Sequence, residues 1–229
     1  MLYKNVADTI RKHLDHVSQR VASSEIDGLL QNISTAWSEH TIAAKLVCEV
    51  LMYMDKNYIL PHKKPSVYNT TVSIFREVIF YHSSVRDRVR GILLDNIDRE
   101  RKGLMIDKDR MKTVLRMLGE LSVDRVDVYQ EDFETPFLET TRKFYRLESQ
   151  EFLSQNSIPA FMGKAEDRLA EEAARIRNYL SSTTEPKLKH LMDTEYISRC
   201  VRLNFKYHLS RYSTVGCKGT KSTIIIFTL

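Results

Sequence analysis

Apolar residues recur at helical spacing along almost the whole chain, and this periodicity constrains the fold more than any other feature. In the first segment they stand at positions 2, 6, 10, 14 and 17, so residues 2–22 are predicted to form one amphipathic helix. Seven glycines and five prolines in 229 residues leave few places where a helix has to stop. Since no strand pattern separates the helical segments, we predict an all-α protein, either a bundle array or an α-solenoid.

Short breaks divide this periodicity into further segments. Helices are predicted at 24–36, 37–58, 67–82, 84–102, 107–121, 127–156 and 159–181, and after Pro186. The stretch LPHKKPS is the strongest internal boundary, because its two prolines lack backbone donors and disfavour helix just before each ring. Gly103 is placed to end the helix at 84–102. Residues 203–229 lose the pattern and are predicted to be disordered, with an aggregation-prone TIIIF patch.

The distribution of charge argues against a nucleic-acid partner. Of the formal net charge of +5, six positive charges lie from Arg199 onward with no acid among them, which leaves residues 1–198 at −1. In that body, basic residues alternate with acids, as on a solvated helix face. No apolar run reaches the ~20 residues of a membrane span, and the start of the chain has no apolar signal segment. No nucleic-acid or membrane partner is therefore expected.

Three scattered cysteines, Cys48, Cys200 and Cys217, fit reduced thiols better than a disulfide framework. This favours a cytoplasmic and nuclear location.

No motif for catalysis or metal binding is present. His13 and His16 share a helix face, but a metal would need further ligands. The carboxylates of YQEDFETPFLE, residues 129–139, are interpreted as helix-surface charge, because Arg and Lys are equally abundant. We expect no catalytic residue, no metal site and no cofactor.

The stretch EVLMYMDKNY, residues 49–58, combines core and surface features. Placed on a helical wheel, five apolar residues fall within about 100° of arc and are predicted to form one buried stripe: Ala43, Leu46, Val47, Val50 and Met54. Tyr53 lies at the edge of that stripe, with Glu49 and Lys56 further round the same flank. Met52 lies nearly opposite the stripe. These four side chains remain available for a partner.

Several longer sequence motifs occur in the same order and at the same spacing as in a known family. They are WSEH at 37–40, LMYMDKNYI at 51–59, SVYNTTVSIFREVI at 66–79, LLDNIDRERKG at 93–103, VYQEDFETPFLE at 128–139, FLSQNS at 152–157, RLAEEAARIRNYL at 168–180 and STTEPK at 182–187. Together they resemble the N-terminal region of the cullin family, over about residues 2–199. Several such motifs in the same order and spacing identify a family far more specifically than a single motif does.

The resemblance implies a curved stalk of stacked five-helix cullin repeats, belonging to the scaffold of a ubiquitin ligase. On that template residues 1–60 correspond to the last three helices of a first repeat, 66–182 to a second repeat and 184–202 to the start of a third. The tail at 203–229 matches nothing in the family. The part of a cullin that binds the RING subunit has no counterpart here, so no RING subunit is expected to bind. The two helices that would precede residue 1 are also missing, which predicts exposed apolar stripes on those that remain.

In cullin-3-like members the second and fifth helices of the first repeat contact a BTB-domain substrate adaptor. The fifth corresponds to the stretch at 49–58, so the resemblance implies adaptor contacts for Tyr53 and Lys56, with Glu49 and Met52 as flanking positions. Two alternatives stay open. One is a helical-repeat interaction or tethering module unrelated to ubiquitination. The other is a nucleic-acid binder that acts through the basic tail.

Overall fold

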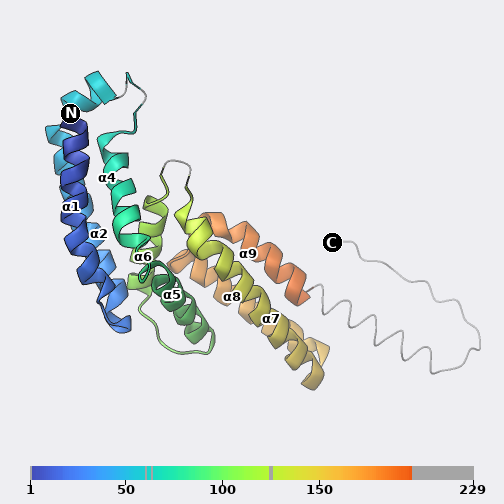
Figure 1. Cartoon of the computed structure of the whole chain (residues 1–229). Helices are drawn as coiled ribbons and strands as arrows, with labels where there is room; N and C mark the ends of the chain where they lie inside the picture. The colour runs from blue at the N-terminus through green and yellow to red at the C-terminus, as the bar shows by residue number, and fades with distance from the viewer. Residues whose placement is uncertain (1, 60, 63, 124–125, 198–229) are drawn as a thin grey trace, which may run out of the picture.

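The computed structural model describes residues 2–59, 61–62, 64–123 and 126–197, and within them it contains helices joined by short turns and no strand (Figure 1). The predicted all-α class is therefore confirmed. The α-helices are α1 Leu2–Ala22, α2 Ile26–Val50, α3 Met52–Met54, α4 Val67–Phe75, α5 Arg86–Arg101, α6 Lys108–Glu120, α7 Thr135–Gln155, α8 Ile158–Asn178 and α9 Glu185–Met192. Short π-helical segments are η1 Asp55–Ile59, η2 Arg76–Phe80, η3 Gln130–Glu134 and η5 Asp193–Ile197, and η4 Ser182–Thr184 is a 3-10 turn. The disorder predicted for residues 203–229 concerns residues outside the described ranges.

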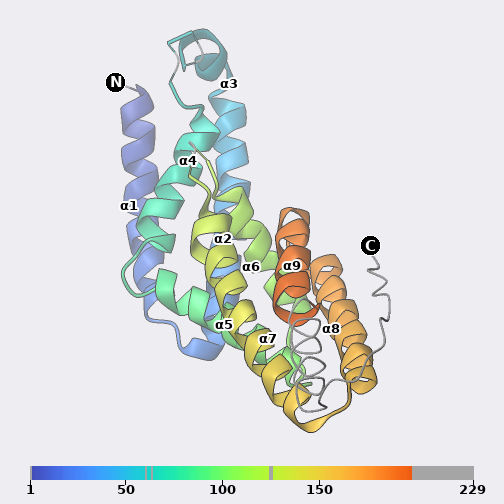
Figure 2. The same cartoon turned by 90° about the vertical axis from the view of Figure 1, so that its right-hand side faces the viewer.

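The helices form an elongated array rather than a closed bundle. Helices α1, α2 and α4 lie side by side at one end, α5 and α6 occupy the middle, and α7, α8 and α9 form the other end (Figures 1 and 2). The buried core follows this arrangement. One apolar cluster extends from Leu14 in α1 to Leu188 in α9, and a second, around Tyr145 and Phe161, joins α7, α8 and α9. The core crosses the predicted boundary at LPHKKPS without a break, and the division into cullin repeats remains a prediction.

The first two helices show where segmentation from sequence succeeds and where it fails. Helix α1 has the predicted bounds, with Leu14 and Val21 buried on one face. The break predicted near Ala36 does not occur, because α2 continues through that position. Residues 2–59 thus hold two long helices and a short helical turn in place of the three helices predicted. Ala36 and Trp37 are both buried and nothing between them interrupts the helical ladder.

Polar caps and one glycine fix several helix ends. Gly103 has φ +81° and follows α5, and the amide of Leu104 bonds the carbonyl of Arg99 at 3.0 Å while that of Gly103 bonds Glu100 at 2.9 Å. This pair of bonds is the Schellman motif, so the predicted stop is confirmed. Helix α6 begins after Asp107, whose carboxylate accepts from the amide of Arg110 at 2.9 Å.

A buried ionic network joins α5, α7 and α8. One oxygen of Glu172 accepts from Arg101 Nε at 3.0 Å, from Arg175 Nη1 at 2.7 Å and from the hydroxyl of Tyr145. Arg175 also donates to Glu100 at 2.8 Å. The side chains of Glu172, Arg101 and Arg175 are each 3% exposed. The two cations and two carboxylates balance, so the desolvated charges hold three helices in one register.

Glu100 remains ionised within this network. Burial by itself disfavours its charge, but hydrogen bonds from Tyr179 and Lys108 and the charge of Arg175 outweigh that effect and lower the pKa of the Glu100 carboxyl. Tyr179 donates to Glu100 at 2.6 Å. The carboxylate therefore attaches the end of α8 to the end of α5.

The carboxylates in YQEDFETPFLE are not all surface charges, which corrects the prediction. Asp132 and Glu134 are 1% and 2% exposed. Arg86 bonds Asp132 at 2.5 Å, and Glu134 accepts from Lys187 and, at 2.8 Å, from Thr184. They are buried because the π-helical segment η3 turns both carboxylates towards neighbouring elements that supply donors. Their role here is structural, joining η3 to α5 and to the start of α9.

Two arginines donate hydrogen bonds to backbone carbonyls of distant segments. They take the place of the amide donors that carbonyls near helix ends lack. Arg88 donates to the carbonyl of Ala22 at 3.0 Å and to that of Ser24 at 2.5 Å, at the end of α1. Arg76 donates to Leu121 at 3.1 Å, just after α6, and is 7% exposed. Carbonyls at helix ends lack intrahelical donors, and a guanidinium satisfies several at once. The alternation of charges predicted solvated side chains, whereas Arg76 is buried and Arg88 is half-buried.

Replacing Glu172 with glutamine tests the network. The change leaves Arg101 and Arg175 with one buried counter-charge fewer at nearly constant volume, and the free energy of unfolding is expected to fall by about 3–5 kcal/mol. Urea titration followed by circular dichroism measures the loss. Glu166→Gln, at an exposed position of the same helix, is the matched control and should change stability by less than about 0.5 kcal/mol. Equal midpoints for both variants would contradict the role given to Glu172.

Candidate functional site

The four residues predicted to contact an adaptor lie where α2 ends. The helical ladder continues across this end, because the amide of Leu51 bonds the carbonyl of Val47 at 2.9 Å and that of Asp55 bonds Leu51 at 3.0 Å. The period then widens into the π-helical segment η1. The surface that this end presents is therefore shared by the last turn of α2, which ends at Val50, by α3 and by η1, and consists of hydrogen-bonded helical turns.

All four predicted side chains are exposed. Tyr53 is 80% and Met52 is 54% exposed, and Glu49 and Lys56 also face solvent. The carbonyl of Tyr53 accepts from the side chain of Asn57 at 2.8 Å. We call these four residues the α2 flank. The structure brings them together over about two helical turns, which belong to the end of α2, to α3 and to η1. Their contact with a partner remains a prediction.

The stripe predicted as core next to the flank is largely exposed, which is a correction. Leu46 is 58% and Val50 is 82% exposed, Ala43 is exposed and Val47 is only half-buried. The side chain of the fifth member, Met54, lies outside the described part of the chain. Ala44, 3% exposed, takes the core position instead.

The start of α2 determines which face is buried. Leu30, Ile33, Trp37 and His40 are buried at successive spacings of three or four, and the next position in that series is Ala44. A helical wheel drawn only over residues 43–58 does not show which face is buried, because it leaves out the earlier residues that determine this.

The exposed apolar side chains of α2 form a second stripe, which the sequence reasoning did not assign to the surface. We call it the α2 outer face, and it consists of Ile42, Ala43, Leu46, Val50 and Tyr53. Ile42 is 60% exposed. The spacing of 42, 46, 50 and 53 is itself helical and was the signal that could have revealed it. The exposed apolar stripe predicted from the family resemblance is therefore present, and Tyr53 belongs both to it and to the flank.

Asp55 and the following loop hold the flank in place. The carboxylate of Asp55 accepts from the amide of Val67 at 3.3 Å, and the Ser66 hydroxyl accepts from that of Asn69 at 3.1 Å. Both bonds satisfy free donors at the start of α4. Lys64 places its ammonium 4.9 Å from the ring centre of Tyr58. The end of α2 is thus joined to α4.

His40 fixes the middle of α2 to α4. Its Nε2 lies 3.0 Å from the carbonyl of Thr71, and since a carbonyl only accepts, Nε2 carries the proton. Its ring packs 5.0 Å from that of Phe75. Burial lowers the pKa of His40 to about 4, although the bond to Thr71 opposes this shift, and the charge of His13 adds to the lowering. The imidazole is therefore neutral at physiological pH.

The thiol next to the flank is not an activated nucleophile. Cys48 is half-buried, and burial, followed by the charge of Asp55, raises the pKa of its thiol. No group of three or more metal-ligating side chains occurs among the residues that the structure describes. No helix in the same residues is long and apolar enough to cross a bilayer.

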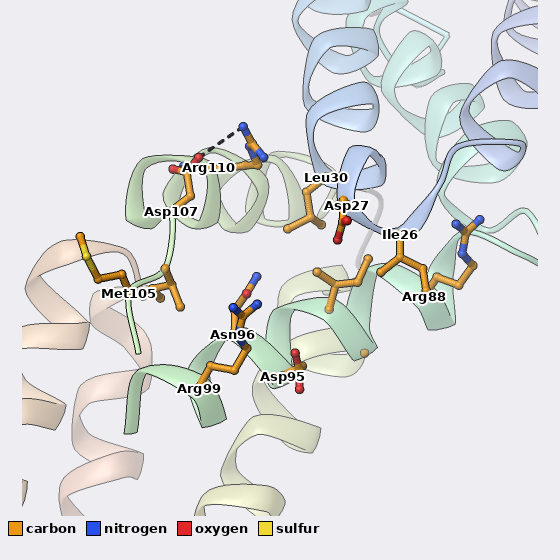
Figure 3. Close-up of a pocket in the computed structure, with 13 residues that line it drawn as sticks. Ile26, Asp27, Leu30, Arg88, Asp95, Asn96, Arg99, Met105, Asp107 and Arg110 are labelled. Atoms are coloured by element: carbon orange, nitrogen blue, oxygen red, sulfur yellow. Dashed lines mark hydrogen bonds and ion pairs between the residues drawn. The ribbon is translucent and has the colours of Figure 1, made fainter. Parts of the chain in front are cut away.

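A groove of about 510 Å³ opens at the opposite end of α2, between the start of that helix, α5 and the loop before α6 (Figure 3). Its charged residues include Asp107 and Arg110, which pair with each other at 3.3 Å. Met105 is 94% exposed at its rim. The groove is remote from the α2 flank and offers a reference surface for experiments on it.

The elongated array of packed helices places this chain in the class of α-solenoid proteins. The chain matches the cullin alpha solenoid domain over residues 1–210, and it belongs to the cullin family. It is 35% identical to Cullin-3 of Dictyostelium discoideum over 88% of this chain and 26% of that protein. It is 32% identical to Cullin-3B of Arabidopsis thaliana over 88% of this chain and 27% of that protein.

Cullin-3 of Caenorhabditis elegans is 31% identical over 88% of this chain and 26% of its own length. The chain thus spans about a quarter of the length of these relatives, 26–27%.

The neutral state of His40 makes folding pH-dependent. Its pKa is about 4 in the folded chain and 6.5 in the reference state, so the unfolded chain binds more protons between these values. The stabilisation is fully present above pH 6.5 and is lost as the pH falls towards 4. At most about 3 kcal/mol is involved. In His40→Gln, whose amide can still donate to Thr71, this pH dependence is expected to disappear.

The measurement is the free energy of unfolding in urea at several values between pH 4 and 7. His16→Gln, at an exposed position of α1, is the control and should follow the wild-type profile. Parallel profiles for wild type and His40→Gln would show that His40 does not titrate on unfolding.

Proposed function

We propose that this chain is a non-catalytic scaffold piece of a cullin-RING ubiquitin ligase that binds BTB-domain substrate adaptors for ubiquitin-dependent degradation. The proposal rests on family membership and on one structural observation, the exposure of the α2 flank on hydrogen-bonded helical turns. Relatives named Cullin-3 recur among the similar proteins. In this proposal the protein holds other proteins at a fixed separation and performs no reaction itself.

The chemistry of the flank supports a docking role. Tyr53 presents a large amphipathic ring that has few rotatable bonds, so ordering it against a partner costs little entropy. Lys56 adds a positive charge one turn further on, and no ion pair involves it within the described part of the chain. Met52 and Glu49 extend the surface on either side. A buried aromatic anchor with a charged rim is the usual composition of a protein interface.

Two assignments follow from the same proposal and remain open to test. No RING-subunit contact is proposed, because the words that resemble the family lie in its N-terminal region. A cytoplasmic and nuclear location is proposed from the reduced cysteines expected at positions 48, 200 and 217.

The test is the binding of a panel of purified BTB domains, measured by isothermal titration calorimetry. Tyr53→Ala is expected to raise the dissociation constant about 30-fold, as for an aromatic hot spot worth ~2 kcal/mol. Lys56→Ala should have a smaller effect that decreases at high salt. Met105→Ala, at the remote groove, is the control and should leave affinity unchanged.

A second version of the chain carries two additional N-terminal helices, taken from the sequence of a Cullin-3 relative, and so provides the other half of the expected surface. If this extended chain binds no BTB domain, the adaptor role is wrong. If it binds and Tyr53→Ala binds equally well, the role survives and the assignment to the α2 flank is wrong.

A further inference from the structure

The groove between the start of α2, α5 and the loop before α6 combines apolar and charged groups that the α2 flank does not use. Its volume of about 510 Å³ is in the range of protein binding clefts. Met105 and Ile26, at its two ends, are 94% and 66% exposed (Figure 3). Ile26 lies about 160° round the helix axis from Ile42, so the groove is not part of the α2 outer face. Exposed apolar side chains around a cleft mark a binding surface.

One face of α5 forms a long wall of this groove. Its lining positions recur at spacings of three and four, from Arg88 through Ile92 and Asp95 to Arg99. They span about 16 Å along the axis, which is about three helical turns. Gly91 lies on the same face, and a Cβ atom there would meet no other atom within 4 Å. The wall is therefore long enough and open enough for another helix to lie along it.

Three charged side chains that line the groove have no ion pair within the described part of the chain. Asp27 and Asp95 are exposed and come from two different helices, α2 and α5. Arg99 is also exposed and lies one turn beyond Asp95, towards Met105 (Figure 3). The charged side chains at positions 88, 107 and 110 are already bonded within the chain. The free charge of the groove is thus negative towards the start of α2 and positive towards the end of α5.

We propose that this groove binds an amphipathic helix of a partner protein, which lies antiparallel to α5 and carries an acidic residue near its N-terminal end and a basic residue near its C-terminal end. The basic residue faces Asp27 and Asp95, and the acidic residue faces Arg99. Apolar side chains between them fill the groove.

The walls of the groove favour a helix over an extended peptide. Helices α2 and α5 bond their backbone polar groups internally, so they offer no edge to which a strand could add. The antiparallel direction suits the helix dipoles as well. It brings the negative C-terminal end of the partner helix to the positive start of α2, and its positive N-terminal end to the negative end of α5. An acid in its first turn and a base in its last turn also stabilise the partner helix itself.

The probe is a stapled synthetic helix of about four turns, with leucines on one face, a glutamate in the first turn and a lysine in the last. Fluorescence polarisation with the full 229-residue chain measures its binding, and we expect a dissociation constant of about 10–100 µM. A second probe with the two charges exchanged should bind about 10-fold more weakly. The double variant Asp95→Lys with Arg99→Glu should prefer the second probe.

Gly91→Arg tests whether the probe occupies the groove. The arginine would fill the open part of the wall and pair with Asp95 one turn on, so affinity for the first probe should fall at least about 10-fold. Gly163→Arg in α8 is the matched control and should leave the affinity unchanged. A Cβ atom at Gly163 also meets nothing within 4 Å, and Asp167 follows four positions on. Circular dichroism checks that both variants fold.

Failure of the first probe to bind at about 1 mM overturns the proposal. Equal binding of both probes also overturns it and points to a purely apolar ligand, and so does an equal loss in Gly91→Arg and Gly163→Arg. Tyr53→Ala should bind the probe as the wild type does, because the α2 flank lies at the other end of α2. The result is therefore independent of adaptor binding, and a loss in Tyr53→Ala would show that the probe does not bind in the groove.

Discussion

A carboxylate that accepts three hydrogen bonds is the contact on which the register of the array depends. The Oε1 atom of Glu172 accepts from Arg101, Arg175 and Tyr145, which lie on three different helices, α5, α8 and α7. A purely apolar interface allows helices to slide by a fraction of a turn at little cost. A desolvated charge does not, because any shift leaves a guanidinium without a partner in a medium of low polarity. The network therefore fixes how one end of the array is oriented relative to the middle.

Local sequence signals were sufficient to predict most helix ends. They were not sufficient to predict which charged residues are buried. Gly103 and Asp107 act on their own turn of backbone, so their effect can be predicted from neighbouring residues. The partners of Glu172 and Glu134 lie up to 71 and 53 positions away, and nothing in their immediate sequence distinguishes them from solvated glutamates. Long-range pairing depends on how helices pack, which periodicity does not specify.

Helix α2 shows the same limit within one element. It carries two apolar stripes, one through Trp37, His40 and Ala44 and the other through Ile42, Leu46 and Val50, and a wheel treats both as candidate core. Which stripe is buried depends on the neighbours α4 and α6, which pack on the first. The predicted flank was less sensitive to this error. Tyr53 lies on the edge of the exposed stripe, and a residue at an edge stays accessible over a range of phases.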